Sequence, residues 1–205
     1  MLKIGITGGI GSGKTIICRL FALLGIPVYD SDFQAKWVMQ HDSWLRTELI
    51  KAFGEKTYSA SGQLDRPYLA NLVFNQPEKL AQLNGLVHPR VKADFTNWLS
   101  AQEQMPYILK EAALMFESQA YKQVDKVITV SAPLPVRLAR VLHRDPHRSP
   151  ADVQSIISKQ LSEEERQQRA DYILFNDDQQ LVIPQVLALH QTLLQLSQEI
   201  TSGTI

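Results

Sequence analysis

The chain has 205 residues, enough for one sizeable hydrophobic core with an inserted cap or lid beside it. Lys+Arg and Asp+Glu both number 21, so the net charge is zero, and no overall cationic field attracts nucleic acid or anionic lipid. The single cysteine, Cys18, excludes an internal disulfide and a cysteine-based zinc cluster. The sequence also holds neither a signal peptide nor an apolar run of membrane-spanning length, so we expect a cytoplasmic protein.

Short apolar runs alternate with helical patterns along most of the chain, which is typical of a parallel sheet covered by helices on both faces. Buried strands are expected at residues 2–7, 26–29, 107–109, 126–130 and 172–175. Helices are expected at residues 14–24, where Gly25 is a stop signal, and at 133–144 and 181–200. The pattern predicts an α/β fold with a five-stranded parallel sheet.

Two segments interrupt this alternation. Residues 33–100 are polar and mostly helical in pattern, with no convincing strand, and we interpret them as an inserted helical domain. Residues from about 144 to 169 are highly charged and contain two prolines, a composition that suits a mobile lid. We therefore expect a core formed by residues 1–32 and 101–205, with the lid at about 144–169.

The glycine-rich segment Gly8-Gly9-Ile10-Gly11-Ser12-Gly13-Lys14-Thr15 matches the P-loop pattern at every fixed position, between an expected strand and an expected helix. Glycines let the backbone wrap closely around a phosphate, so that N–H groups converge on it, and the positive end of the helix adds to the attraction. Lys14 is expected to bridge the β- and γ-phosphates of ATP, and the Thr15 hydroxyl to bind Mg²⁺. The alternative is a glycine-rich turn that only joins a strand to a helix.

A pair of aspartates, Asp30 and Asp32, follows the expected strand at 26–29. Ligands in open α/β sheets bind beyond the carboxyl ends of the strands, so one of these carboxylates is placed to accept the proton of an attacking hydroxyl. We favour Asp32. Spacing alone leaves open that Ser31 or one of the aspartates caps a helix through residues 33–39.

Three arginines, Arg137, Arg140 and Arg144, recur at i, i+3 and i+7 and so share one face of the helix that leads into the expected lid. Guanidinium groups suit phosphoryl oxygens and can neutralise charge that develops during transfer. A solvated cationic stripe is the alternative interpretation of the same spacing.

In this order the motifs make the sequence similar to the dephospho-coenzyme A kinase family, and the resemblance covers nearly the whole chain. Besides the P-loop and the aspartate pair, it rests on the segments 64–66, 73–74, 86–89, 114–117, 137–140, 160, 170–172 and 176. The resemblance implies ATP-dependent phosphorylation of the ribose 3′-hydroxyl of dephospho-coenzyme A, the last step of coenzyme A synthesis. It also implies a P-loop NTPase-type fold of the nucleoside-monophosphate-kinase kind, in which residues 33–100 bind the coenzyme A acceptor.

Residue roles follow from the same resemblance. It implies that Asp32 is the general base and binds the acceptor, that Arg140 clamps phosphates from the lid side, and that Arg66 and His88 lie near the acceptor. The resemblance also implies that Asn176 lies near the adenine. The nucleotide phosphates are expected to be bound by Gly11, Ser12, Gly13, Lys14, Thr15 and Ile16, the last through its backbone N–H. His88 has a second interpretation, as a histidine that is merely satisfied within its helix.

Two departures from the family pattern stand out. Ala112-Ala113-Leu114 occurs where the family usually has a proline before its paired leucines, and Asp177-Asp178 stands where aspartate and glycine usually follow the asparagine. The first departure leaves open a different backbone course after the third strand, and the second leaves the form of the turn on the adenine side open.

Three other function classes compete with this interpretation. The nearest is another small-molecule P-loop kinase, acting on a nucleoside, a nucleoside monophosphate or a sugar acid. A nucleotide-dependent switch is disfavoured because the chain has no Asn-Lys-x-Asp or Asp-x-x-Gly motif, and a nucleic-acid-binding module is disfavoured by the neutral charge. We expect a monomer or a weak homo-oligomer with no nucleic-acid or membrane partner.

Overall fold

The computed structural model describes residues 1–74 and 76–203, and these divide into two compact units. The first unit comprises residues 1–30 and 102–205, and the second comprises residues 31–101. The first boundary thus falls between Asp30 and Ser31, ahead of the boundary expected after Asp32, because helix α2 already begins at Ser31.

A five-stranded sheet with the order β2-β3-β1-β4-β5 forms the centre of the first unit, and every neighbouring pair is parallel. Its strands are β1 (Leu2–Gly8), β2 (Val28–Asp30), β3 (Tyr107–Glu111), β4 (Lys126–Ser131) and β5 (Tyr172–Phe175). The expected α/β class and the five parallel strands are confirmed. In the middle of the sheet β1 and β3 are buried almost throughout, as a strand covered on both faces must be.

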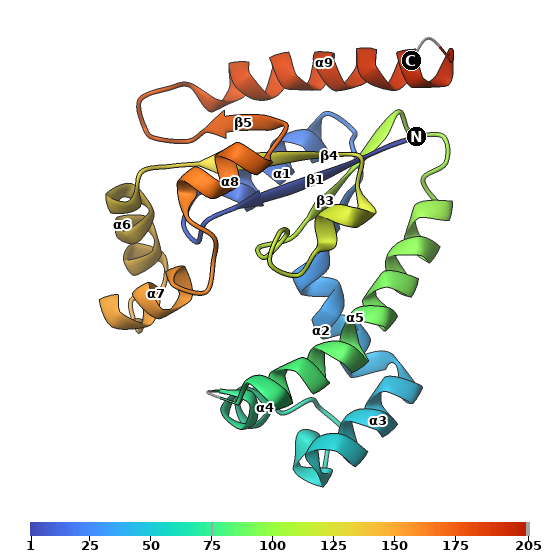
Figure 1. Cartoon of the computed structure of the whole chain (residues 1–205), viewed down its shortest axis with the longest axis vertical. Helices are drawn as coiled ribbons and strands as arrows, with labels where there is room; N and C mark the ends of the chain where they lie inside the picture. The colour runs from blue at the N-terminus through green and yellow to red at the C-terminus, as the bar shows by residue number, and fades with distance from the viewer. Residues whose placement is uncertain (75, 204–205) are drawn as a thin grey trace. The chain divides into compact units, whose positions relative to one another are not determined.

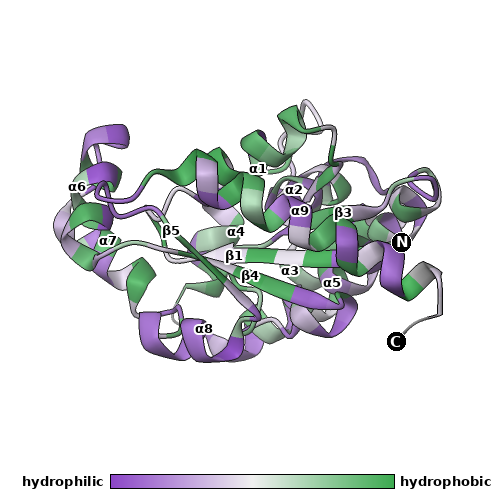
Figure 2. Cartoon of the chain, turned by 90° about the horizontal axis from the view of Figure 1, so that it is seen from above, coloured by the Kyte–Doolittle hydropathy of each residue, from purple (hydrophilic) through white to green (hydrophobic). Residues whose placement is uncertain are grey.

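Helices lie on both sides of this sheet (Figures 1 and 2). Helix α1 (Lys14–Leu23) and helix α9 (Val182–Thr201) contact each other and the sheet, whereas the hydrophilic helix α8 (Glu163–Arg169) contacts β4 on the opposite side. The main core joins α1, α9 and the strands through residues such as Ile6, Phe21 and Leu193. Helices α6 (Leu134–Arg144) and α7 (Pro150–Ile157) complete the unit, with the short 3₁₀ helix η2 (Ala120–Gln123).

The second unit is helical. It consists of α2 (Ser31–His41), α3 (Ser43–Phe53), the 3₁₀ helix η1 (Glu55–Thr57), α4 (Arg66–Val73) and α5 (Pro77–Ser100). An apolar cluster around Leu45, Leu49 and Val87 forms its own core. Among the residues that the structure describes in this unit, the only extended pairing is an isolated antiparallel bridge between Tyr58 and Leu64.

The chain reverses sharply between α1 and β2. Gly25 has a φ of 83°, and the N–H of Ile26 donates to the Phe21 carbonyl at 3.1 Å. Ile26 therefore closes the helix instead of opening the strand, and β2 begins two residues later than expected, at Val28. Because β1 and β2 both pair in parallel with β3, the carboxyl ends of these strands lie at the same edge of the sheet.

Candidate phosphoryl-transfer site

The glycine-rich loop leads directly from the buried strand β1 into helix α1, which begins at Lys14. Gly11 and Gly13 have φ values of 80° and 90°, a left-handed region that favours glycine, and the N–H of Ser12 donates to the Gly9 carbonyl at 3.0 Å. A cavity of about 720 Å³ opens over the loop and is lined by residues 8–16 with Arg19, Ala113, Arg140, Val141, Arg144, Ile156 and Gln160. The loop thus has the curled backbone and the open space that an oligophosphate requires.

A buried carboxylate holds both functional side chains of the loop. Oε1 of Glu111, at the end of β3, lies 3.2 Å from Lys14 Nζ and accepts a hydrogen bond from Thr15 Oγ1 at 3.1 Å. Glu111 and Glu117 both lie near the ends of expected strands or helices, and the sequence alone does not decide which of them is the acid near the metal. The structure places Glu111 against Thr15, whereas Glu117 accepts a hydrogen bond from the Leu161 N–H at 2.7 Å.

Cys18, one helical turn beyond Lys14, is buried close to the same carboxylate. Burial, and then the charge of Glu111, which also accepts a hydrogen bond from this thiol, raises the pKa of Cys18 far above its ordinary value. The thiol is therefore neutral at physiological pH. Lys14 and Glu111 are the charged partners in this part of the site.

The three arginines of α6 do not act as one row. Arg140 Nη1 donates to the Asn176 carbonyl at 2.9 Å, and its Nη2 pairs with Asp178 Oδ1 at 2.5 Å. Arg144 is exposed and pairs with Asp145 at 2.8 Å. Arg140 and Arg144 line the cavity over the phosphate loop, whereas Arg137 is almost fully buried and lines a different cavity.

Asn176, directly after β5, holds the phosphate loop at Ser12. Its Nδ2 donates to the Ser12 carbonyl at 2.8 Å and lies where a Cβ on Gly13 would be. Asp178 has a φ of 64°, the conformation that a glycine would adopt at this place, and its carboxylate reaches Arg140. Asp178 therefore adopts a left-handed turn of the kind that favours glycine, and its side chain forms an ion pair with Arg140.

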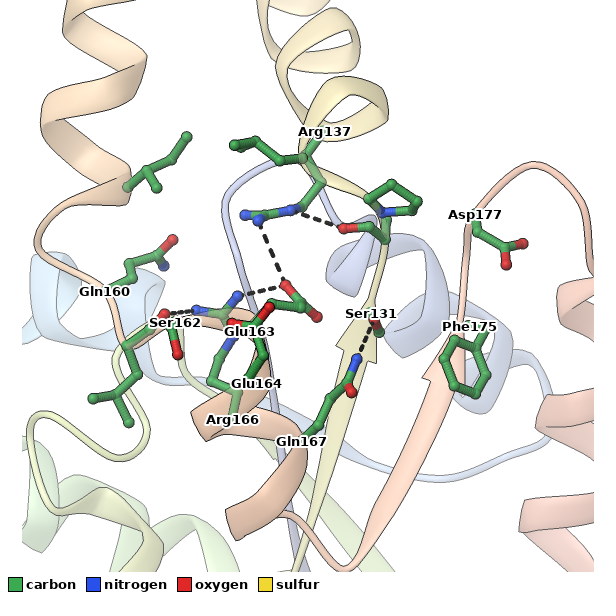
Figure 3. Close-up of a pocket in the computed structure, with 15 residues that line it drawn as sticks. Ser131, Arg137, Gln160, Ser162, Glu163, Glu164, Arg166, Gln167, Phe175 and Asp177 are labelled. Atoms are coloured by element: carbon green, nitrogen blue, oxygen red, sulfur yellow. Dashed lines mark hydrogen bonds and ion pairs between the residues drawn. The ribbon is translucent and has the colours of Figure 1, made fainter.

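A second cavity, of about 660 Å³, lies beside α6 and α8 in the same unit (Figure 3). Glu163 Oε2 lies between two buried guanidinium groups, 3.5 Å from Arg137 Nη2 and 2.6 Å from Arg166 Nη2. Both groups occupy the space that a Cβ on Gly9 would need, so the glycine permits them to approach the loop closely. Burial lowers the pKa of Arg137, an effect that Glu163 partly offsets.

Sequence reasoning singled out Arg137 but missed its neighbours Glu163 and Arg166. Glu163 and Arg166 stood within a charged stretch that composition assigned to a lid, and nothing in their spacing pointed to the phosphate loop. The available signal was Gly9, because a glycine without a positive φ marks a close approach by another group.

The residues expected at the acceptor belong to the second unit. Asp32 is exposed in the first turn of α2, Arg66 is exposed at the first position of α4, and His88 is exposed on α5. The Ser31 hydroxyl is buried and has no hydrogen-bond partner among the residues that the structure describes, so it does not cap α2. Asp30 ends β2 in the first unit and is half-buried.

The described residues contain no group of three or more His, Cys, Asp or Glu side chains that could hold a metal ion. Within that same part of the chain, no helix is both long and apolar enough to cross a lipid bilayer. A divalent cation at this site would therefore depend on the Thr15 hydroxyl, the Glu111 carboxylate and phosphate oxygens. This donor set suits Mg²⁺, which is commonly held by one or two protein oxygens together with phosphates.

Comparison with known proteins identifies the family. The family model for dephospho-CoA kinase matches residues 2–181. Dephospho-CoA kinase of Bacteroides fragilis is 40% identical over 188 residues, covering 92% of this chain and 91% of the relative. The enzyme of Porphyromonas gingivalis is 38% identical over 192 residues, 94% of each chain.

Two solved structures have folds similar to that of this chain. The crystal structure of TT1252 from Thermus thermophilus superposes with a TM-score of 0.82 at 34% identity, covering 95% of this chain and 97% of the other. Dephospho-CoA kinase from Campylobacter jejuni shares the fold, with a TM-score of 0.64 at 24% identity over 99% and 98% of the two chains. The chain belongs to the dephospho-CoA kinase family.

Proposed function

We propose that this protein transfers the γ-phosphoryl group of ATP to the ribose 3′-hydroxyl of dephospho-coenzyme A, giving coenzyme A and ADP. The reaction is the last step of coenzyme A synthesis. The main support for this proposal is the family match over residues 2–181. The geometry of the phosphate loop agrees with it, because Lys14 and Thr15 both contact the buried carboxylate of Glu111.

The loop supplies the donor site. Residues 11–16 surround the cavity where α1 begins, so their N–H groups and the positive helix end favour the triphosphate. Lys14 pairs with Glu111 in this structure, and we propose that it exchanges this partner for the β- and γ-phosphates when ATP binds. ATP brings several negative charges against the single charge of Glu111, which drives the exchange.

The fit to Mg²⁺ rests on two oxygens, because Thr15 Oγ1 and Glu111 Oε1 lie 3.1 Å apart. When bound, Mg²⁺ neutralises charge on the β- and γ-phosphates. Thr15 would ligate it, and the Glu111 carboxylate, once Lys14 has left, would orient its hydration shell. The Glu111 carboxylate would thus pair with Lys14 when the site is empty and support the metal ion when ATP is bound.

Two further groups complete the donor side. Arg140 reaches the cavity over the loop while anchored to Asn176 and Asp178, so it can contact phosphate without a large movement. Asn176 fastens Ser12 and lies beside the turn at Asp178, and we propose that the adenine binds near this turn. The charge that develops on the moving phosphoryl group is then stabilised by Lys14 and Arg140.

The helical unit would supply the acceptor side. We propose that residues 31–101 bind dephospho-coenzyme A, that Asp32 accepts the proton of its 3′-hydroxyl, and that Arg66 and His88 lie near the acceptor. This assignment is supported by the place of Asp32 immediately after β2, beyond the carboxyl end of a strand. The segment 144–169 would act as a lid that keeps water from the γ-phosphate.

The working form that we propose is a cytoplasmic monomer or weak homo-oligomer with no nucleic-acid partner. The zero net charge supports the last point, because nucleic-acid binding relies on a basic surface.

The test is direct. Purified protein is incubated with ATP, Mg²⁺ and dephospho-coenzyme A, and the product is identified by mass and by the position of its new phosphate. Formation of coenzyme A supports the proposal, and an acceptor analogue without the 3′-hydroxyl should give no product. Faster ADP release with a nucleoside, a nucleoside monophosphate or a sugar acid would instead identify another small-molecule kinase.

A further inference from the structure

One side chain from the segment 144–169 reaches into the phosphate loop itself. Gln160 follows α7 and precedes α8, and its Oε1 accepts a hydrogen bond from the Ile10 N–H at 2.9 Å. Its Nε2 donates to the Ala113 carbonyl, just after β3, at 3.3 Å. Gln160 lines the cavity over the loop and also the second cavity, where Figure 3 shows it.

The hydrogen bond from Ile10 to Gln160 is one of two bonds that fix the orientation of the peptide group between Gly9 and Ile10. The Gly9 carbonyl accepts from the Ser12 N–H at 3.0 Å, while the N–H of the same peptide group, on Ile10, donates to Gln160. Rotation of this peptide would break both bonds at once. A glycine precedes the plane and another follows Ile10, so the backbone has little intrinsic resistance to such a rotation.

The bond also joins distant parts of the sequence. Ile10 and Gln160 are 150 positions apart. Gln160 belongs to the segment 144–169, which is held together next to Gln160 by bonds from Arg166 to the Leu161 carbonyl and to Glu163. A displacement of this segment therefore withdraws the acceptor from Ile10. The adjoining amides, at residues 11–15, are those expected to meet phosphate.

We propose that Gln160 is a positioning residue, which fixes the Gly9–Ile10 peptide so that the phosphate loop keeps its phosphate-binding form only while the segment 144–169 is in place. This inference rests on the proposed function, because it assumes that the loop binds ATP. Gln160 itself need not contact the nucleotide.

The test uses Gln160→Met, which keeps the length and much of the volume of the side chain but removes both hydrogen bonds. We expect the Kd for ATP, measured by calorimetry, to rise about 3- to 10-fold, the effect of one or two neutral hydrogen bonds. At saturating ATP, kcat should stay within about twofold of wild type, since the reacting groups are unchanged. Amide hydrogen exchange at Ile10 in the nucleotide-free protein should become faster.

Gln167→Met is the matched control. Gln167 lines the second cavity and donates to Ser131 Oγ at 2.9 Å, but within the described part of the chain it makes no hydrogen bond to the phosphate loop. Its variant should bind ATP as wild type does and show unchanged exchange at Ile10. Thermal unfolding of both variants verifies that each is folded.

The outcomes separate the two proposals. Wild-type affinity for ATP and unchanged exchange at Ile10 in a folded Gln160→Met protein would overturn the positioning role and leave the proposed function intact. A wild-type protein that fails to bind ATP would instead count against the proposed function. Equal losses of affinity in both variants would show a general effect of the cavity and would also overturn the role of Gln160.

Discussion

Gly13→Ala tests whether the left-handed backbone of the phosphate loop matters for both stability and nucleotide binding. Gly13 has a φ of 90°, and a non-glycine residue in the left-handed region costs about 1–2 kcal/mol. A Cβ at this position would also displace the Asn176 side chain from the Ser12 carbonyl, and the lost hydrogen bond adds about 0.5–1.5 kcal/mol. The free energy of unfolding should therefore fall by about 1.5–3.5 kcal/mol in total.

Gly25→Ala provides the matched control. Gly25 has a similar φ of 83°, but no atom of the described residues lies within 4 Å of the position that its Cβ would take. Only the backbone cost of about 1–2 kcal/mol applies there. Urea unfolding gives both values, and calorimetry gives ATP affinity, which we expect to fall about tenfold or more in Gly13→Ala alone. Equal destabilisation of the two variants, or unchanged ATP affinity in Gly13→Ala, would refute this reasoning.

Three further predictions concern single side chains. Lys14→Ala should abolish turnover because the γ-phosphoryl group loses its ammonium partner; steady-state ADP release within about tenfold of wild type would contradict the assignment. Asp32→Asn should lower kcat by about 10²-fold or more while ATP affinity stays unchanged, and an unaltered kcat would remove Asp32 as the base. Burial lowers the pKa of Lys110 to about 8, so between about pH 8 and the ordinary lysine value the unfolded chain holds a proton that the folded protein has released. The free energy of unfolding should therefore rise with pH across this window, and the rise should be smaller in Lys110→Met. Urea unfolding at about pH 7 and about pH 9.5 measures the rise in both proteins. An equal rise in the variant would exclude Lys110 as its source.

Most of the fold was predictable because burial and periodicity act locally. The strand at Tyr172–Phe175 was predicted at its observed bounds, and β1, β3 and β4 each differ from prediction only at their carboxyl ends. The start of β2 was wrong for a non-local reason. Ile26 looks like a strand residue, yet its N–H is used to close α1, and apolarity alone cannot distinguish these two uses.

The site was predictable only where a motif fixes several residues at once. The phosphate loop, with Lys14 and Thr15, was identified from spacing, because each position has its own geometric requirement. Glu111 was left undecided, since the chain brings it to Thr15 through the pairing of β1 with β3. Gln160 and Arg166 reach the loop through tertiary packing of a segment whose composition suggested only mobility. The helical spacing of Arg137, Arg140 and Arg144 was real, but it did not reveal that their partners differ.

A crystal structure with Mg²⁺ and a non-hydrolysable ATP analogue would show where and how the protein holds the triphosphate. We expect the triphosphate in the cavity over residues 8–16, with the amides of residues 11–15 pointing at it. We also expect that Lys14 Nζ, which lies 3.2 Å from Glu111 Oε1 without nucleotide, contacts the phosphates instead. A triphosphate bound elsewhere, or a Lys14 still paired with Glu111 while the nucleotide is in place, would contradict these expectations.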